Sequence, residues 1–180
     1  MSLQGYSLFN TAIGRCGIAW NDRGVASVLL PDAHDAALRA HLQRRFPSAI
    51  ETTPPPDVKQ AISAMQQLLS GEPTDLSFVA LDMTGVPEFN QRVYEAARTI
   101  RPGTTVSYGD IARQLGIPGS ARAVGQALGR NPFPIVVPCH RVLAAGGRIG
   151  GFSAQGGIAT KRRMLAIEGA QLYGVDAARR

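Results

Sequence analysis

Three short runs near the start of the chain are rich in apolar residues. The runs read YSLFNTAIG (6–14), CGIAW (16–20) and VASVLLP (25–31), and the turn sequence NDRG separates the last two. Short apolar runs bounded by turn residues are typical of β-strands. We therefore predict a small sheet here, and one more strand over LSFVALDM (76–83).

Apolar residues recur at intervals of three and four in the segments 35–46, 58–69 and 89–100. This spacing places them on one face of a helix, and proline or glycine follows each segment. The sequence GGIATKRRMLAIEGA (156–170) predicts a closing helix, with Gly169 just beyond its end. These patterns predict four longer helices.

Two shorter helices are predicted over 108–115 and 120–128, joined by the turn GIPGS. Ser107 followed three residues later by Asp110 is a capping-box signature, and Ser120 can cap the second helix. Two short helices joined by a tight turn form a helix-turn-helix pattern, which also occurs in ordinary helical domains.

The patterning changes from strands to helices near Gly85–Pro87. We therefore predict an α+β protein with two small domains, residues 1–85 and 86–172, and a tail over 173–180. At 180 residues and 44% hydrophobic, the chain can bury one good core or two small ones. No apolar stretch is long enough for a bilayer span, and the N-terminus lacks a signal-peptide pattern. We expect a cytoplasmic protein without membrane contact.

Charge is distributed unevenly along the chain. Residues 1–106 hold nine basic and ten acidic residues, a balance of −1, whereas residues 107–180 hold ten and three, a balance of +7. A basic half attached to a neutral half points to a polyanionic partner, with nucleic acid the leading candidate. Codon bias could explain the excess of Arg over Lys, but not the scarcity of acids after residue 106.

The stretch NPFPIVVPCHRV (131–142) places Cys139 between a proline and a histidine. Pro138 would end ladder pairing, so Cys139 is expected at a strand end, and His140 with Arg141 would favour the thiolate below the free-cysteine pKa of about 8.5. Neighbours in an extended segment point to opposite faces, so His140 would act through a water or from an adjusted backbone. From the residues alone, an activated nucleophile and a buried structural cysteine remain alternatives.

The imidazole would need an acid to orient it, and Glu168 and Asp110 are the candidates. Glu168 could equally be a surface ion-pair partner of the basic residues on its own helix. We interpret Cys16, which lies between glycines in GRCGIAW, as structural packing. The histidines share no zinc-ligand spacing with the cysteines, so no metal is expected.

The second short helix, SARAVGQALG, carries small residues where a major-groove reader normally carries polar side chains. Small residues allow close backbone approach, which suits minor-groove binding by shape, but they also pack helix against helix. Arg122 would either contact a phosphate or insert among the bases.

Taken together, PCHRV, NPFPIVVP, VSYGDIA and ARAVGQALGRNP resemble the O6-alkylguanine-DNA alkyltransferases, also called methylated-DNA–protein-cysteine methyltransferases. The match runs from about Val86 to Gly169, and FNTAIGRCGIAW resembles the start of the family's N-terminal domain. The resemblance implies a ribonuclease-H-like N-terminal domain and a winged-helix, helix-turn-helix C-terminal domain.

The resemblance also implies that the protein repairs double-stranded DNA, as a monomer and without a cofactor. The resemblance implies that Cys139 takes the alkyl group from O6-alkylguanine, and also from O4-alkylthymine, after minor-groove binding and base flipping. The thioether that forms is not reversed, so each molecule acts once.

Residue roles follow from the same resemblance. His140 would be the base for Cys139 through a water, Glu168 would orient His140, and Asn131 would brace the turn around the site. Tyr108 would donate a proton to the departing guanine and help turn the nucleotide, and Arg122 would fill the gap in the base stack. The expected DNA contacts are Ser107, Tyr108, Ser120, Ala121, Arg122, Ala123 and Gly125. The expected base pocket is lined by Pro134, Val142, Phe152 and Ser153.

Some positions depart from the family pattern. Phe152 stands where the family often has tyrosine, and GFSAQGGIATK is about two residues longer than in many members. Three other functions remain to be compared: a non-catalytic binder of alkylated DNA, a helix-turn-helix regulator, and a Cys-His hydrolase. The presence of Cys139 argues against a non-catalytic binder. The small residues of the second short helix argue against a regulator that reads base edges. Repeated turnover would distinguish the third.

Overall fold

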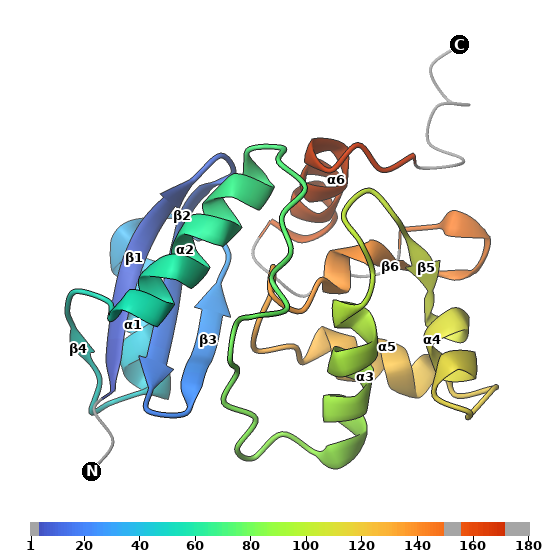
Figure 1. The fold of residues 1–180 in the computed structure, drawn as a ribbon, viewed down its shortest axis with the longest axis horizontal. Coiled ribbons are helices and arrows are strands. Elements are labelled where there is room, and N and C mark those ends of the chain that lie inside the picture. Colours follow the sequence, from blue (N-terminus) through green and yellow to red (C-terminus); the bar gives the residue numbers. More distant parts are fainter. Residues whose placement is uncertain (1–3, 150–155, 172–180) are drawn as a thin grey trace.

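The computed structural model describes residues 4–149 and 156–171. Its N-terminal part is built on a four-stranded sheet of order β3-β2-β1-β4 (Figure 1). The strands are β1 (Gly5–Thr11), β2 (Gly14–Asn21), β3 (Gly24–Leu29) and β4 (Ile50–Glu51). The first three are the strands predicted from the short apolar runs and form an antiparallel meander, and β4 adds a parallel partner to β1.

One helix covers each face of this sheet (Figure 1). These helices are α1 (Asp35–Arg45) and α2 (Pro56–Leu69). Alternate residues of β1 point to opposite faces, so Tyr6 and Leu8 pack with Leu38 and Leu42 of α1. Phe9 belongs instead to the larger core that contains the buried residues of α2. The sheet is therefore buried on both faces, which explains the consecutive buried residues of β1, β2 and β3.

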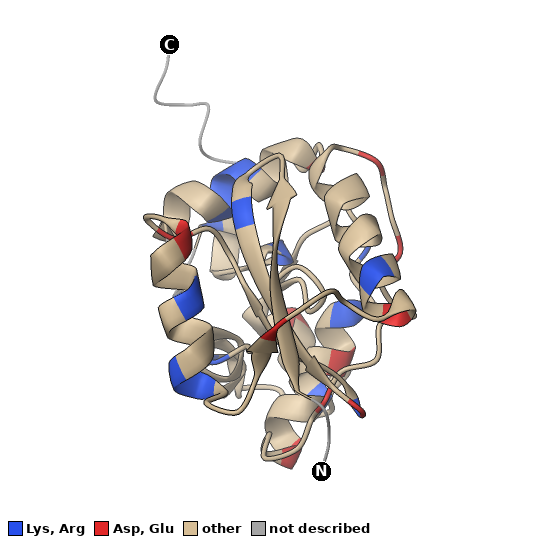
Figure 2. Cartoon of the chain, turned by 90° about the vertical axis from the view of Figure 1, so that its left-hand side faces the viewer, with Lys and Arg blue, Asp and Glu red and all other residues tan. Residues whose placement is uncertain are grey.

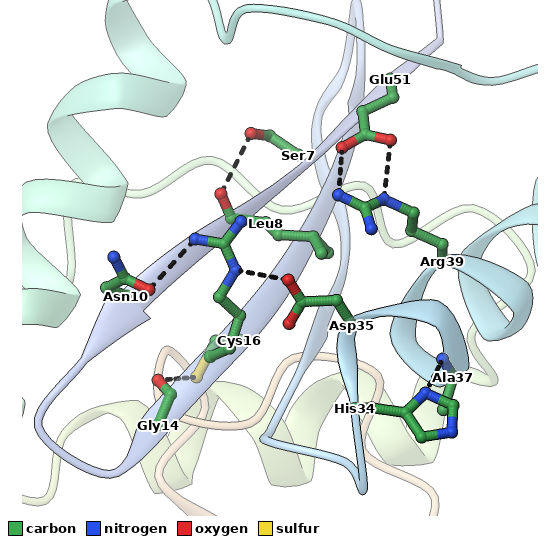
Figure 3. A network of polar contacts seen from close by, with 11 residues as sticks. Ser7, Leu8, Asn10, Gly14, Cys16, His34, Asp35, Ala37, Arg39 and Glu51 are labelled. Atoms are coloured by element: carbon green, nitrogen blue, oxygen red, sulfur yellow. Dashed lines mark hydrogen bonds and ion pairs between the residues drawn. The ribbon is translucent and has the colours of Figure 1, made fainter.

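Polar contacts fasten α1 to the edge of the sheet (Figure 3). Arg39 donates to both carboxylate oxygens of Glu51, at 2.9 and 3.1 Å, and so ties α1 to β4. Cys16 is fully buried, with its sulfur 4.0 Å from the Gly14 carbonyl oxygen, and burial raises the pKa of its thiol to about 11. Cys16 is therefore a packed residue and a poor nucleophile, in line with its interpretation from sequence.

The C-terminal part is mainly helical, which confirms the α+β class. Its helices are α3 (Glu88–Arg98), α4 (Tyr108–Gln114), α5 (Ala121–Gly129) and α6 (Gly157–Ile167). A two-stranded parallel sheet joins β5 (Val106–Ser107) to β6 (Val142–Leu143). α4 and α5 pack against each other as the helix-turn-helix pattern predicts. None of the helices in the described ranges is long and apolar enough to cross a membrane.

The predicted caps of α4 and α5 differ in outcome. Ser107 Oγ accepts from the Asp110 backbone N–H at 3.0 Å, and the Asp110 carboxylate accepts from the Ser107 N–H at 2.8 Å, which confirms the capping box. Ser120 occupies the N-cap position of α5, but its side chain makes no capping hydrogen bond there. Its backbone (φ −95°, ψ 24°) lies outside the extended region that N-cap residues favour.

The strand predicted over 76–83 is absent apart from one bridge, between Val25 and Leu81. The physical reason is Arg98, whose guanidinium takes the carbonyls that a strand would need. Its Nη2 donates to the carbonyl oxygens of Leu76, Ser77 and Val79 at 3.0, 3.3 and 2.9 Å. The segment is therefore held by α3 over residues 76–79 and by β3 just beyond, where the Val25 N–H donates to the Ala80 carbonyl at 2.9 Å and the Asp82 N–H to the Val25 carbonyl at 2.8 Å.

The two halves share one hydrophobic core. Buried residues from the sheet, α2, α3, α4, α5 and the segment 133–137 form a single connected cluster. In addition, the Val28 N–H of β3 donates to the Pro132 carbonyl oxygen at 3.0 Å. The sheet thus contacts directly the segment that leads to Cys139, whereas the exact division at residues 85–87 stays a prediction.

Candidate functional site

Cys139 begins a short 3-10 turn (Cys139–Arg141) that runs directly into β6. The strand end expected from sequence is wrong, because residues 134–137 form turns and Ile135 has a positive φ of 76°. Asn131 stabilises these turns: its Nδ2 donates to the Val137 carbonyl at 2.9 Å, and its Oδ1 accepts from the Phe133 N–H at 2.8 Å. Asn131 thus occupies the bracing position that the family resemblance implies.

Glu168, the residue after α6, binds two side chains of this turn. His140 Nε2 lies 2.7 Å from Glu168 Oε1, and Arg141 donates from Nη2 to Oε1 at 2.8 Å and from Nε to Oε2 at 2.9 Å. The three side chains are 0%, 2% and 6% exposed for His140, Glu168 and Arg141 respectively. Glu168 is therefore a buried partner of the active-site turn, and the surface ion pair considered from sequence is wrong.

Burial and hydrogen bonding set the protonation states of this pair. Burial alone would raise the pKa of Glu168, but hydrogen bonds from His140 and Arg141, and their charges, lower it to about 2. Burial lowers the pKa of His140, against the opposing effect of Glu168. At neutral pH the imidazole is thus neutral and donates from Nε2 to the carboxylate. Within the described ranges, Nδ1 has no hydrogen-bond partner and so can accept a proton.

Cys139 is 9% exposed as a residue, and burial raises the pKa of its thiol. A hydrogen bond with Asn131, the charge of Lys161 and nearby backbone N–H groups act in the opposite direction. The thiolate expected from the basic sequence neighbours is therefore not the resting form. The neighbouring cations were visible in the sequence, but the desolvation that outweighs them was not. The thiol must lose its proton during any reaction.

A large groove lies beside the helix-turn-helix. It has a volume of about 1140 Å³ and is lined by α4, α5, residues 105–107 and residues 143–147. Of the expected DNA contacts, it brings together Ser107, Tyr108, Ala121, Arg122 and Gly125, whereas Ser120 and Ala123 do not line it.

Tyr108 and Arg122 take different positions in this groove. Arg122 is exposed, and Tyr108 is partly buried with its ring close to Gly125. Burial, followed by the charge of Cys139, raises the pKa of the Tyr108 phenol, so its hydroxyl stays protonated.

On the N-terminal side of the molecule, acidic and basic positions are interspersed (Figure 2).

A smaller cavity, of about 260 Å³, adjoins the acceptor residue, and we call it the Cys139 cavity. Cys139, Asn131 and Pro134 line one side of it, and residues of β3 and α1 line the other. Of the other expected pocket residues, Val142 is fully buried in β6 and lines neither this cavity nor the groove. Phe152 and Ser153 lie outside the described residues.

These features can be compared with those of known proteins. The chain is 34% identical over 158 residues to the methylated-DNA–protein-cysteine methyltransferase of Methanothermobacter thermautotrophicus, a match that covers 88% of this chain and 81% of that protein. The chain belongs to the O6-methylguanine DNA methyltransferase family. Residues 88–170 match the family's domain described as 6-O-methylguanine DNA methyltransferase, DNA binding domain. A Mycobacterium bovis member is 46% identical over 132 residues, covering 73% of this chain and 78% of that protein.

Solved structures of O6-methylguanine DNA methyltransferases share the fold. The Mycobacterium tuberculosis O6-methylguanine methyltransferase superposes with a TM-score of 0.74 at 35% identity, over 98% of both chains. The enzyme of Pyrococcus kodakaraensis gives 0.69 at 31% identity, over 92% of this chain and 99% of that one. A Mycobacterium tuberculosis structure in complex with DNA gives 0.71 at 35% identity, over 92% of both chains. The family assignment made from PCHRV and its neighbours is confirmed.

One residue of this methyltransferase site was missed by sequence reasoning. Lys161 is 1% exposed, donates from Nζ to the Val142 carbonyl at 2.8 Å, and lowers the pKa of Cys139 through its charge. From the sequence, Lys161 was considered only as one of the surface basic residues on the helix that carries Glu168. The signal was its spacing, because Lys161 shares a helical face with Met164, Leu165 and Glu168, all of whose side chains are buried.

Proposed function

We propose that this chain, a methylated-DNA–protein-cysteine methyltransferase, repairs DNA by moving the alkyl group of O6-alkylguanine irreversibly onto Cys139. O4-alkylthymine is proposed as a second substrate, by resemblance to the family. The observation that best supports the proposal is the buried contact of His140 with Glu168, directly beside the acceptor thiol. This pair leaves one imidazole nitrogen able to take the thiol proton.

The reaction would begin with deprotonation of Cys139. Its proton passes through a water to Nδ1 of His140, and the ionised Glu168 stabilises the imidazolium that forms. The thiolate attacks the alkyl carbon, so that a carbon–sulfur bond forms as the bond to O6 breaks. Tyr108, whose raised pKa keeps its hydroxyl protonated, donates a proton to the departing guanine. The thioether is stable, so each molecule acts once.

A base inside a duplex is out of reach of a buried thiol. The nucleotide must therefore leave the stack, at a cost of about a few kcal/mol. The groove supplies suitable parts for this step: the exposed Arg122 to fill the vacated stack, and the small residues Ala121 and Gly125 to admit the DNA backbone closely. We propose binding from the minor groove, with affinity drawn mainly from phosphate contacts.

The decisive experiment is intact-protein mass spectrometry after incubation with a duplex containing O6-methylguanine, followed by peptide mapping. We expect one added methyl group on Cys139, saturating at one per molecule. Cys139→Ala should gain no methyl group and still bind the duplex. Cys16→Ala is the matched control and should be methylated like the wild type, because Cys16 is packed in the N-terminal core.

Two results would contradict the proposal. An unchanged mass with DNA still bound would indicate recognition without transfer. Release of several methyl groups per molecule would indicate a hydrolase that turns over.

A further inference from the structure

The Cys139 cavity and the groove share no lining residue among those described. Cys139 and Pro134 belong to the cavity, whereas Tyr108 and Arg122 belong to the groove. The far wall of the cavity comes from the N-terminal half, through residues 27–30 of β3 and its following loop and through α1. The N-terminal half thus forms part of the immediate surroundings of the acceptor thiol.

The volume of the cavity exceeds what methyl transfer requires. It measures about 260 Å³, whereas one water molecule takes up about 30 Å³ of liquid. At the moment of transfer the alkyl carbon lies between O6 of the guanine and the sulfur of Cys139. In an in-line displacement the atoms beyond that carbon project sideways from the line between O6 and sulfur, into space beside the thiol, and the Cys139 cavity is a hollow that Cys139 itself lines.

The walls of the cavity combine apolar and hydrogen-bonding groups. Leu128 and Pro134 are apolar and lie on the side of Cys139. Ser27 lines the opposite side, is 1% exposed, and its Oγ has no hydrogen-bond partner among the described residues. A buried hydroxyl without a partner is costly, so Ser27 is suited to bind a polar atom that enters the cavity.

Charged groups lie at the opening of the cavity. Arg45 and His41 of α1 are exposed there, and Asp32 is partly buried on the same wall. The opposite charges of Arg45 and Asp32 offset each other, so the wall favours hydrogen bonding over the binding of a strongly charged group. A neutral polar chain fits this lining best.

We propose that the Cys139 cavity is the subsite for the alkyl tail, and that Ser27 selects tails ending in a hydroxyl or another neutral oxygen. O6-(2-hydroxyethyl)guanine would then be preferred over O6-propylguanine, whose tail has the same number of heavy atoms but ends in a methyl group. The inference rests on the proposed function. It makes the N-terminal half a determinant of substrate choice.

The first test compares rates of transfer from duplexes that differ only in the adduct: methyl, 2-hydroxyethyl or propyl. We expect the wild type to react faster with hydroxyethyl than with propyl. Ser27→Ala should lower the hydroxyethyl-to-propyl rate ratio by about fivefold, the typical effect of one net hydrogen bond. Ser7→Ala, in the same sheet but outside the cavity, is the matched control and should leave the ratio unchanged. An unchanged ratio in Ser27→Ala would overturn the selective role of Ser27.

The second test fills the cavity. Ser27→Leu should lower the propyl-to-methyl rate ratio by about tenfold or more, because the added side chain takes the space of the tail. Ala26→Leu, one residue earlier in β3, is the control of equal size and should keep the ratio. If Ser27→Leu does not fold, as judged by thermal unfolding, His41→Trp at the exposed opening takes its place.

The outcomes separate this inference from the proposed function. A propyl-to-methyl ratio that does not change in the filled variant overturns the tail subsite, even when methyl transfer is normal. Absence of transfer from all three adducts in the wild type overturns the proposed function itself.

Discussion

Glu168 is a single carboxylate that satisfies donors from both His140 and Arg141 inside the protein. The third nitrogen of the Arg141 guanidinium is also used, because Nη1 donates to the Ile100 carbonyl at 2.6 Å. The turn that carries Cys139 is thus linked to the end of α6 and to the end of α3. Removing the carboxylate would leave the Arg141 charge buried and unpaired, which is strongly destabilising.

This arrangement predicts how stability depends on pH. The pKa of Glu168 falls from an ordinary value near 4.5 to about 2 in the folded protein, so its contribution is complete above about pH 5 and is lost as the pH falls towards 2. The shift corresponds to roughly 3 kcal/mol. The lowered pKa of His140 acts in the same direction, because protonation below about pH 6.5 favours the unfolded chain.

Urea unfolding at pH 7, 5 and 3 measures this effect. Glu168→Gln should be less stable than the wild type at pH 7 by roughly 3 kcal/mol and should lose less stability between pH 5 and pH 3. Glu72→Gln, at an exposed position, serves as the control. Parallel pH curves for Glu168→Gln and the wild type would contradict the assigned role.

Sequence reasoning predicted Cys139, His140 and Glu168 as site residues from a short motif and its family resemblance, and the structure brings His140 and Glu168 into contact. It missed what depends on burial. The pKa of Cys139 is raised by desolvation, and Lys161 is directed inward by the packing of α6. Neither fact can be derived from neighbours in the chain, because both depend on which side chains the fold brings together.

At the scale of elements, α5 resolves an ambiguity left by its small residues. Val124, Ala127 and Leu128 are buried, and the Ala127 carbonyl accepts from Tyr94 Oη at 2.7 Å, so one face packs on α3. Ala121 and Gly125 line the groove instead. The helix therefore uses small residues for both purposes, helix packing on one face and an open surface on the other.

Arg122 on α5 supplies a test of base flipping. Arg122→Ala should slow transfer from a duplex by about tenfold or more, because nothing then offsets the cost of unstacking. Reaction with free O6-benzylguanine, which needs no flipping, should be nearly unaffected. Gln126→Ala, also exposed on α5 but outside the groove, is the matched control. Equal slowing on both substrates would rule out the proposed role of Arg122.

The helices were predicted well because their periodicity and caps are local. The capping box of α4 and the apolar faces of α2 and α3 involve residues that are only three or four positions apart in the sequence. The strands β4, β5 and β6 were missed because each has two residues, too few to show alternation, and each pairs with a distant segment. The strand predicted over 76–83 failed because Arg98, far along the chain, occupies its carbonyls.

At the scale of the whole molecule, the shared core predicts that both halves unfold together. Trp20, the chain's single tryptophan, is buried in the sheet and reports on the N-terminal half. The reactivity of Cys139 towards a thiol reagent reports on the other half, with Cys16→Ala as the background. We expect both probes to give the same urea midpoint, since one connected cluster joins them. Two well-separated midpoints would show that the halves are independent.

The contacts of Arg98 with the segment 76–79 also bear on the thermodynamics of association. Arg98 binds three backbone carbonyls of the segment, and β3 binds the residues just beyond it through Ala80 and Asp82, so the connection is tied to both halves. The relative orientation of the N-terminal sheet and the helix-turn-helix is therefore set before a partner arrives. Docking onto a duplex then loses little conformational entropy in this connector, so more of the favourable contact energy remains as affinity.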